Sequence, residues 1–186
     1  YLDRDFSAAH HFWRCYPDGR DPRAPHGNYP PNAAGRYWVK PHAEYMYRAI
    51  PNTRGKYLAV ASTHHGPQYG IPMILDINIP DDNKVSQVKS LISIRDWPAD
   101  ACQEMAPENR FMSPWPLSEQ FYLACLISDT NKTANECGGI AKPVVDDIYL
   151  MDAFGNRELI NRCAVPEGGA FMQCIPLRSR PAPPPA

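Results

Sequence analysis

Proline is spread through the whole chain and limits the helices that this sequence can form. The 186 residues include 21 prolines, about twice the average frequency. Because proline lacks a backbone N–H and its ring clashes with the preceding helical turn, prolines at this density break long helices. No apolar stripe of helical period runs for more than about three turns. The sequence therefore argues against a helical bundle.

Short apolar or alternating runs, separated by turn residues, fill most of the chain. Lys-Tyr-Leu-Ala-Val-Ala-Ser at 56–62 is typical, because aromatic and β-branched residues favour strands. Pro-Asp-Gly-Arg at 17–20 is a strong turn signal after an earlier run. Many short strands at roughly ten-residue spacing predict an all-β sandwich, barrel or propeller. The predicted strands are His11–Tyr16, Tyr45–Ile50, Lys56–Ser62, Ile71–Ile77, Val88–Ile94, Phe111–Pro116, Gln120–Ser128, Asp147–Ala153 and Arg157–Asn161.

One local pattern occurs twice: an aromatic-aliphatic strand, a turn with Asp or Asn beside Gly, then a charged residue. Its copies lie at 12–20 and 148–157, with strands preceded by polar residues at 54–60 and 118–124 between them. This alternation is typical of propeller blades, and at roughly 40–45 residues per blade the chain would hold about two to three. Propellers need about four or more blades to close. Because the chain also starts at Tyr1 without a Met, we expect a processed product or a piece of a longer polypeptide.

Charge and hydropathy exclude several classes of partner. Lys and Arg number 19 and Asp and Glu number 20, so the formal net charge is −1. This balance gives no electrostatic reason to bind nucleic acid or an anionic membrane. No apolar run approaches the roughly 20 residues of a membrane helix, so no membrane span is expected. The proline-rich tail at 177–186 predicts an extended linker after a β-propeller segment at 1–176.

Six cysteines leave two interpretations open. An even count permits disulfides, with about fifteen possible pairings, whereas buried free thiols are the alternative. No two cysteines form Cys-x-x-Cys, so the usual signals of a zinc ribbon, a thioredoxin site and covalent haem attachment are absent from this sequence. The cysteines are Cys15, Cys102, Cys125, Cys137, Cys163 and Cys174.

The stretch Thr-His-His-Gly-Pro-Gln-Tyr-Gly at 63–70 is the best candidate site. It places two imidazoles and a phenol on a short connection between two predicted strands. Strands hold such loop residues rigidly, which suits binding and catalysis. The alternative is that His64 and His65 belong to a hydrogen-bonded turn while Tyr69 packs on the next strand.

Several of these runs together resemble a known family. The sequence is similar to the middle region of hydrazine synthase alpha subunits and to bacterial proteins with TolB-like propeller repeats. The most specific matches are the His-His-Gly motif at 64–66 and Asp-Ala-Phe-Gly-Asn-Arg at 152–157. The other matching runs are Tyr1–Phe6, His10–Cys15, Pro17–Gly19, Arg48–Pro51, Pro116–Ser118, Tyr149–Ile160 and Pro176–Pro181.

The resemblance implies a six-bladed propeller of which this chain is a part, in a periplasmic or extracellular bacterial setting. It also implies c-type haem attached outside this segment, and zinc. Residue by residue, it makes Tyr69 the ligand of haem iron and His65, with His64 beside it, the metal ligand; His10 and His11 are second choices. A tyrosinate is a hard axial ligand, as in catalases, and a neutral imidazole suits zinc.

Three functions follow from these observations. The chain is a redox-enzyme segment that frames a haem, a non-catalytic propeller scaffold or protein-binding module, or a structural subunit of a larger assembly. The expected partners are the remaining blades or a haem-bearing domain, and other subunits of a complex. A hydrolase is disfavoured, because no Gly-x-Ser-x-Gly, His-Glu-x-x-His or P-loop motif occurs. We expect the paired carboxylates Asp81–Asp82 and Asp146–Asp147 to be solvated turn residues or cation-contacting loops rather than an acid–base pair.

Overall fold

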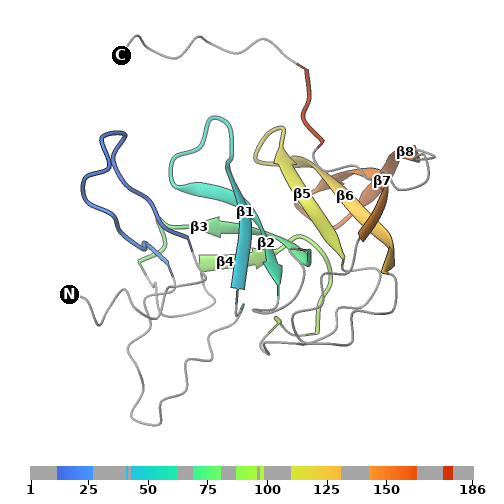
Figure 1. Ribbon diagram of the computed structural model, residues 1–186, viewed down its shortest axis with the longest axis horizontal. Coiled ribbons are helices and arrows are strands. Elements are labelled where there is room, and N and C mark those ends of the chain that lie inside the picture. Colours follow the sequence, from blue (N-terminus) through green and yellow to red (C-terminus); the bar gives the residue numbers. More distant parts are fainter. Residues whose placement is uncertain are drawn as a thin grey trace.

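The chain forms two antiparallel four-stranded sheets, as seen side by side in Figure 1. The computed structural model describes residues 12–26, 41, 43–62, 69–80, 87–95, 97–98, 110–130, 143–162 and 174–177. These residues contain no α-helix, so the prediction of an all-β chain is confirmed. The described part of the chain contains no helix that is long and apolar enough to cross a membrane.

The first sheet is a meander in which each strand pairs with the next along the chain. Its four strands run in the order β1-β2-β3-β4. The strand β2 is the apolar run at 56–62, and five of its seven residues are buried, as expected for a strand covered on both sides. The strands are β1 (Ala43–Ala49), β2 (Lys56–Ser62), β3 (Ile71–Asp76) and β4 (Val88–Ser90).

The second sheet repeats this topology in the order β5-β6-β7-β8. Its first three strands carry the buried residues, whereas all six residues of the last strand are exposed. The strands are β5 (Phe111–Pro116), β6 (Phe121–Thr130), β7 (Pro143–Asp152) and β8 (Arg157–Arg162).

Three predicted segments differ from the structure. In 12–16, the described part of the first predicted strand, Arg14 makes only an isolated bridge with Arg23. The predicted strand 88–94 stops at Ser90, where the chain bends. The strands β6 and β7 extend beyond the predicted strands 120–128 and 147–153, with β6 ending at Thr130 and β7 starting at Pro143. Ladder hydrogen bonds between the two long strands satisfy the polar backbone there, which local composition does not reveal.

The first strands of the two sheets carry equivalent irregularities. The β1–β2 register shifts between Tyr45 and Arg48, and the β5–β6 register shifts between Met112 and Trp115. Inside these shifts, Met46 has φ +59° and Ser113 has φ +50°, a conformation that costs an L-residue about 1–2 kcal/mol.

The two irregular strands also contact each other. The Ser113 N–H donates to Met46 Sδ at 3.1 Å. The Arg48 guanidinium lies 4.7 Å from the centroid of the Trp115 ring. The residues that match in the two sheets therefore meet at their junction.

The turns after the third strands are alike as well. Asp76 ends β3, and its Oδ1 accepts from the N–H of Asn78 at 3.0 Å. Asp152 ends β7, and its Oδ1 accepts from the N–H of Phe154 at 2.8 Å. An aspartate that accepts from the N–H two residues on sets the same turn in both sheets.

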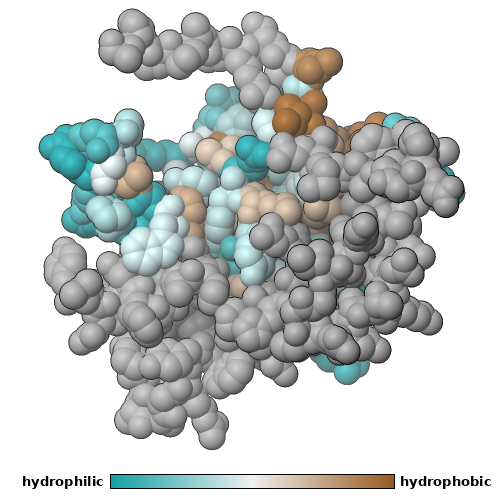
Figure 2. Space-filling model, in the orientation of Figure 1, coloured by the Kyte–Doolittle hydropathy of each residue, from teal (hydrophilic) through white to brown (hydrophobic). Residues whose placement is uncertain are grey.

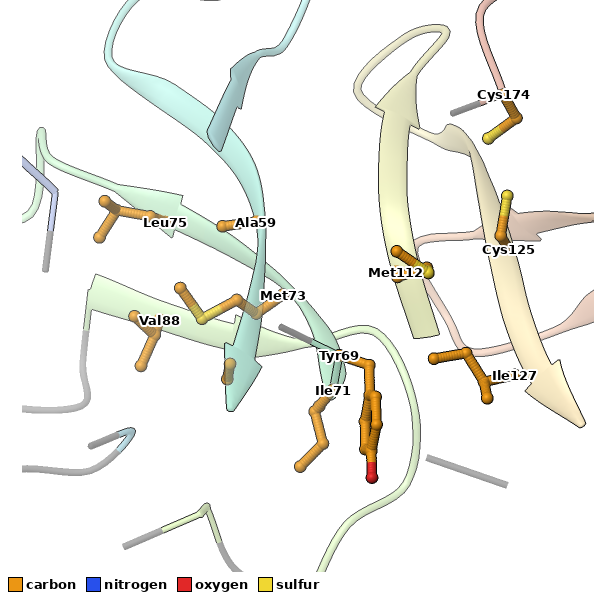
Figure 3. Close-up of a cluster of buried hydrophobic side chains, with 11 residues drawn as sticks. Ala59, Tyr69, Ile71, Met73, Leu75, Val88, Met112, Cys125, Ile127 and Cys174 are labelled. Carbon is orange, nitrogen blue, oxygen red and sulfur yellow. The ribbon is translucent and has the colours of Figure 1, made fainter. Parts of the chain in front are cut away.

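A shared core holds the sheets together. Its largest cluster combines Met73 and Leu75 of β3 with Met112 of β5 and Ile127 of β6, as seen in Figure 3. Each fully buried side chain of this size contributes roughly 1.5–3 kcal/mol through the hydrophobic effect. The sheets therefore pack as one unit through β2 and β3 on one side and β5 and β6 on the other.

Candidate functional site

The backbone on both sides of the predicted His–His–Tyr site is firmly held. On one side, Ser62 Oγ donates to the carbonyl oxygen of Tyr69 at 2.6 Å. On the other, Gly70 and Phe111 exchange two hydrogen bonds, N–H to O at 2.8 and 3.0 Å. The connection thus begins on β2 and ends on a bridge to the second sheet. His64 and His65 lie outside the described residues, as do His10 and His11.

Gly70 is required at this bridge because of a close approach of two backbone segments. A Cβ atom built on Gly70 would lie 2.0 Å from the carbonyl oxygen of Ala61. No side chain fits at that distance, so glycine is what lets β3 start against the end of β2. Glycine next to the predicted ligand therefore has a structural cause in the sheet itself.

The Tyr69 ring lies within the core cluster and is only 7 % exposed. Figure 3 shows the ring beside Ile71 and Ile127, with its hydroxyl pointing away from the sulfur atoms of Cys125 and Cys174. The ring is thus fixed by apolar neighbours, and its oxygen lies at the end remote from the thiols. The structure thus fixes the position of the Tyr69 ring, and its role as a ligand of haem iron stays a prediction.

The zinc half of the predicted site falls on residues outside the described part. Within the described ranges, no group of three or more His, Cys, Asp or Glu side chains is placed to hold a metal ion. Zinc normally takes four ligands. The described residues therefore do not supply three zinc ligands by themselves, and the predicted ligands His65 and His64 lie outside them.

A buried polar network that the sequence did not reveal lies at β1. The His26 and Glu44 side chains are both 0 % exposed, and His26 Nε2 lies 2.9 Å from Glu44 Oε1. The other ring nitrogen, Nδ1, lies 2.7 Å from Gln87 Oε1. The Tyr47 hydroxyl donates to Glu44 Oε2. Residues distant in sequence therefore share one enclosed network.

The hydrogen-bond partners of His26 indicate the protonation state of its ring. Gln87 Nε2 donates to the carbonyl oxygen of Ile79 at 2.7 Å, which leaves Gln87 Oε1 facing His26 as an acceptor. Both ring nitrogens of His26 then face acceptors, an amide oxygen and a carboxylate oxygen. An imidazole that donates from both nitrogens is the imidazolium, and in that form His26 makes a buried ion pair with Glu44.

This ion pair is structural rather than catalytic. Each ring nitrogen of His26 and each carboxylate oxygen of Glu44 already has a partner. Neither ring nitrogen is open to take a proton from a substrate or to bind a metal. The network instead joins the segment at 24–26 to β1 and to Gln87. Only the tertiary fold could identify it, because 61 residues separate His26 from Gln87.

One paired carboxylate differs from its prediction. Asp147 lies inside β7, is largely buried, and accepts from Arg162 Nε of β8 at 3.3 Å. Asp147 therefore forms a cross-strand ion pair with Arg162 and is not a solvated turn residue. The pair Asp81–Asp82 lies outside the described residues.

The described cysteines are all free thiols. Cys15 is exposed, whereas Cys125 and Cys174 are buried together in the core cluster. The Cys125 thiol hydrogen bonds to the Cys174 sulfur, and this bond together with burial raises the pKa of Cys125 far above its usual range. The same bond lowers the pKa of Cys174. The Cys174 thiol in turn donates to the carbonyl oxygen of Ser113 at 3.3 Å.

Comparison with protein-family models, with curated proteins and with solved structures returned no match. The functional assignment therefore depends on the sequence motifs and on the geometry given above.

Proposed function

We propose that this chain contributes two adjacent blades of a β-propeller and works as a non-catalytic scaffold or protein-binding module in a periplasmic or extracellular assembly. The observation that carries the proposal is the common plan of the two sheets. Both are four-stranded meanders with an irregular first strand, and Met46 and Ser113 occupy the matching positions. Repeated four-stranded meanders that pack against each other are typical of neighbouring propeller blades.

The outer strand of the second sheet supports a binding role. The strand β8 is exposed along its whole length, including the apolar side chains of Leu159 and Ile160 at 36 % and 55 %. Phe154, in the turn before it, is 86 % exposed. Apolar residues gathered on an outer strand offer a surface for another blade or another protein.

Photocrosslinking tests the scaffold role. A photoreactive amino acid at Ile160 should join the chain to another protein in cells that produce the complete protein, and mass spectrometry should identify the same adduct in repeated experiments. The matched control carries the probe at Asp18, in the exposed turn at 17–20. Adducts at both positions, or at neither, would count against β8 as the binding surface.

The second candidate is a haem-associated redox segment similar to the hydrazine synthase alpha subunit. The specific observation in its favour is the anchoring of Tyr69, whose carbonyl is held by Ser62 and whose ring is held by the core. In this proposal Tyr69 binds the iron and His65, with His64, binds zinc. A bound haem would supply the redox chemistry, and this chain would fix the phenol oxygen in position.

Haem titration separates the two candidates. If the chain is a haem segment, ferric haem added to it should give a tyrosinate-type absorption spectrum that the Tyr69→Phe variant lacks. Tyr16→Phe is the matched control, because Tyr16 is an exposed tyrosine at 59 %. A scaffold should show the same spectrum for the wild type and both variants. Metal analysis of the natively purified protein then tests whether zinc is lost in a His65→Ala variant.

A further inference from the structure

The short segment 174–177 lies on the surface of the second sheet, with one side chain turned into the protein. Cys174 is 7 % exposed, whereas Ile175 and Leu177 are 44 % and 102 % exposed. Figure 2 shows brown, apolar atoms at the place where Figure 1 draws this segment in red. The segment is therefore anchored through Cys174.

The anchor sits against the irregular part of β5 and the facing residue of β6. Cys174 Sγ lies 3.3 Å from the carbonyl oxygen of Ser113. Cys125, the residue of β6 that pairs with Met112, is fully buried. Figure 3 shows the two sulfur atoms directed towards each other, from the C-terminal segment and from β6. The fold has thus selected one pair from the many that the sequence left open.

We propose that Cys125 and Cys174 are an oxidisable dithiol, a modification site that closes to a disulfide by exchange with a low-molecular-weight disulfide such as oxidised glutathione. The two sulfur atoms already touch through a hydrogen bond. The sulfur atoms face each other, and the 174–177 segment takes part in no strand pairing, so side-chain rotation and movement of this segment can bring them to bonding distance. The product fastens this segment to β6.

The exchange balances in two steps. The Cys174 thiolate attacks one sulfur of oxidised glutathione, which forms a mixed disulfide and releases one glutathione thiolate that takes up a proton. Cys125 then loses its proton and attacks the Cys174 sulfur, and the second glutathione leaves as its thiol. Two cysteine thiols are oxidised and one glutathione disulfide is reduced to two thiols.

The order of attack follows from the positions of the two thiols. Cys174 is the less buried member and lies on a segment outside the sheets, so a small oxidant reaches it first. It is also the member whose pKa is lowered, by the hydrogen bond from Cys125 and by Arg48 nearby. Thiolates and not thiols are the attacking species. Cys125 is the resolving residue.

Peptide mapping tests the pairing directly. Trypsin cuts after Arg110 and Lys132 to give a peptide in which Cys125 is the only cysteine, and after Arg162 and Arg178 to give one that holds Cys163 and Cys174. In a Cys163→Ser variant, the second peptide therefore contains Cys174 alone. After treatment with oxidised glutathione, free thiols are blocked and the digest is analysed with and without reductant.

The expected result is one reducible species that joins the 111–132 peptide to the 163–178 peptide. A Cys125 peptide joined to Cys102 or Cys137, a lasting glutathione adduct on Cys174, or two freely blocked thiols would each overturn the proposal. This measurement does not depend on a variant of either paired cysteine, so it holds even where those variants fold poorly.

Thermal unfolding tests whether the disulfide fastens the 174–177 segment to β6. A disulfide that closes a loop of this length should raise Tm by an amount on the order of 10 °C. The rise should vanish in Cys174→Ser and persist in Cys15→Ser, since Cys15 is the exposed one of the three described cysteines. A crosslink that forms without a rise in Tm would contradict the fastening role.

Discussion

The two sheets share a backbone topology, but different buried side-chain pairs connect them to neighbouring segments. In the first sheet, Glu44 of β1 pairs with the buried His26, whose other ring nitrogen lies against Gln87. In the second, the matching region near β5 and β6 carries the thiols Cys125 and Cys174. The two sheets therefore share the irregular first strand and the turn after the third strand. The buried side chains that hold each sheet to a neighbouring segment differ between them.

The edges of the sheets differ in the same way. The last strand of the first sheet, β4, has only three residues, and Val88 in it is buried. The last strand of the second sheet, β8, has six, and all are exposed. A short edge offers little pairing surface, so the second sheet is the one suited to a partner.

The junction of the sheets gives the largest expected effect. Gly70→Ala should lower the free energy of unfolding by about 5 kcal/mol or more, or prevent soluble folding, because the Cβ would overlap the Ala61 carbonyl oxygen. Urea unfolding monitored by tryptophan fluorescence measures it. Gly19→Ala is the control: a Cβ there meets nothing within 4 Å, so only the strain of its φ of +80° should remain, at a cost of about 1–2 kcal/mol. Equal losses in both variants would contradict the account of this close approach.

Breaking the His26–Glu44 pair should lower the free energy of unfolding nearly as much. His26→Ala leaves the Glu44 carboxylate buried without its cation, which should cost about 3–5 kcal/mol of unfolding free energy. The double variant His26→Leu, Glu44→Met removes both charges and should be more stable than His26→Ala. Urea unfolding of the two variants provides the comparison, and a double variant less stable than the single one would exclude a buried ion pair.

The irregular first strands give an intermediate effect. Ser113→Val should lower the free energy of unfolding by about 2 kcal/mol, because β-branched residues are strained at positive φ. Ser113→Gly adopts the same φ without strain, so it should lie within about 1 kcal/mol of the wild type. Denaturant unfolding of both variants tests this, and a Val variant as stable as the Gly variant would show that the strand is regular there.

The matching turns give the smallest effect, and it depends on pH. Hydrogen bonds from the Asn156 side chain and from backbone N–H groups hold the pKa of Asp152 below its ordinary value of 3.8. A lowered pKa stabilises the fold above the unfolded-state value and ceases to do so as pH falls through the folded-state value. Asp152→Asn should therefore lower Tm slightly at neutral pH.

The difference in Tm between Asp152→Asn and the wild type should shrink as pH falls below about 4. Scanning calorimetry across that range measures the change, with Asp76→Asn as the matched variant in the first sheet. A difference in Tm that grows towards acid pH would have the wrong sign and would contradict the role given to the Asp152 carboxylate.

Local pattern predicted the strands well and the site only in part. The run at 56–62 matches β2 residue for residue, and 111–116 matches β5, because short apolar segments bounded by turn residues carry their own signal. Tyr69 lies at the end of the connection between β2 and β3. Its role at haem iron, and the zinc roles of His65 and His64, stay predictions.

The sequence by itself determined the class of fold and the positions of most strands, since proline density, alternation and turn residues act over a few neighbouring positions. Only the tertiary structure decided which distant groups meet. It placed His26 against Gln87, Cys125 against Cys174, and Gly70 against Ala61. The physical reason is that these contacts arise when separate sheets and segments pack, and no local periodicity records the residue that will lie on the other side of a core.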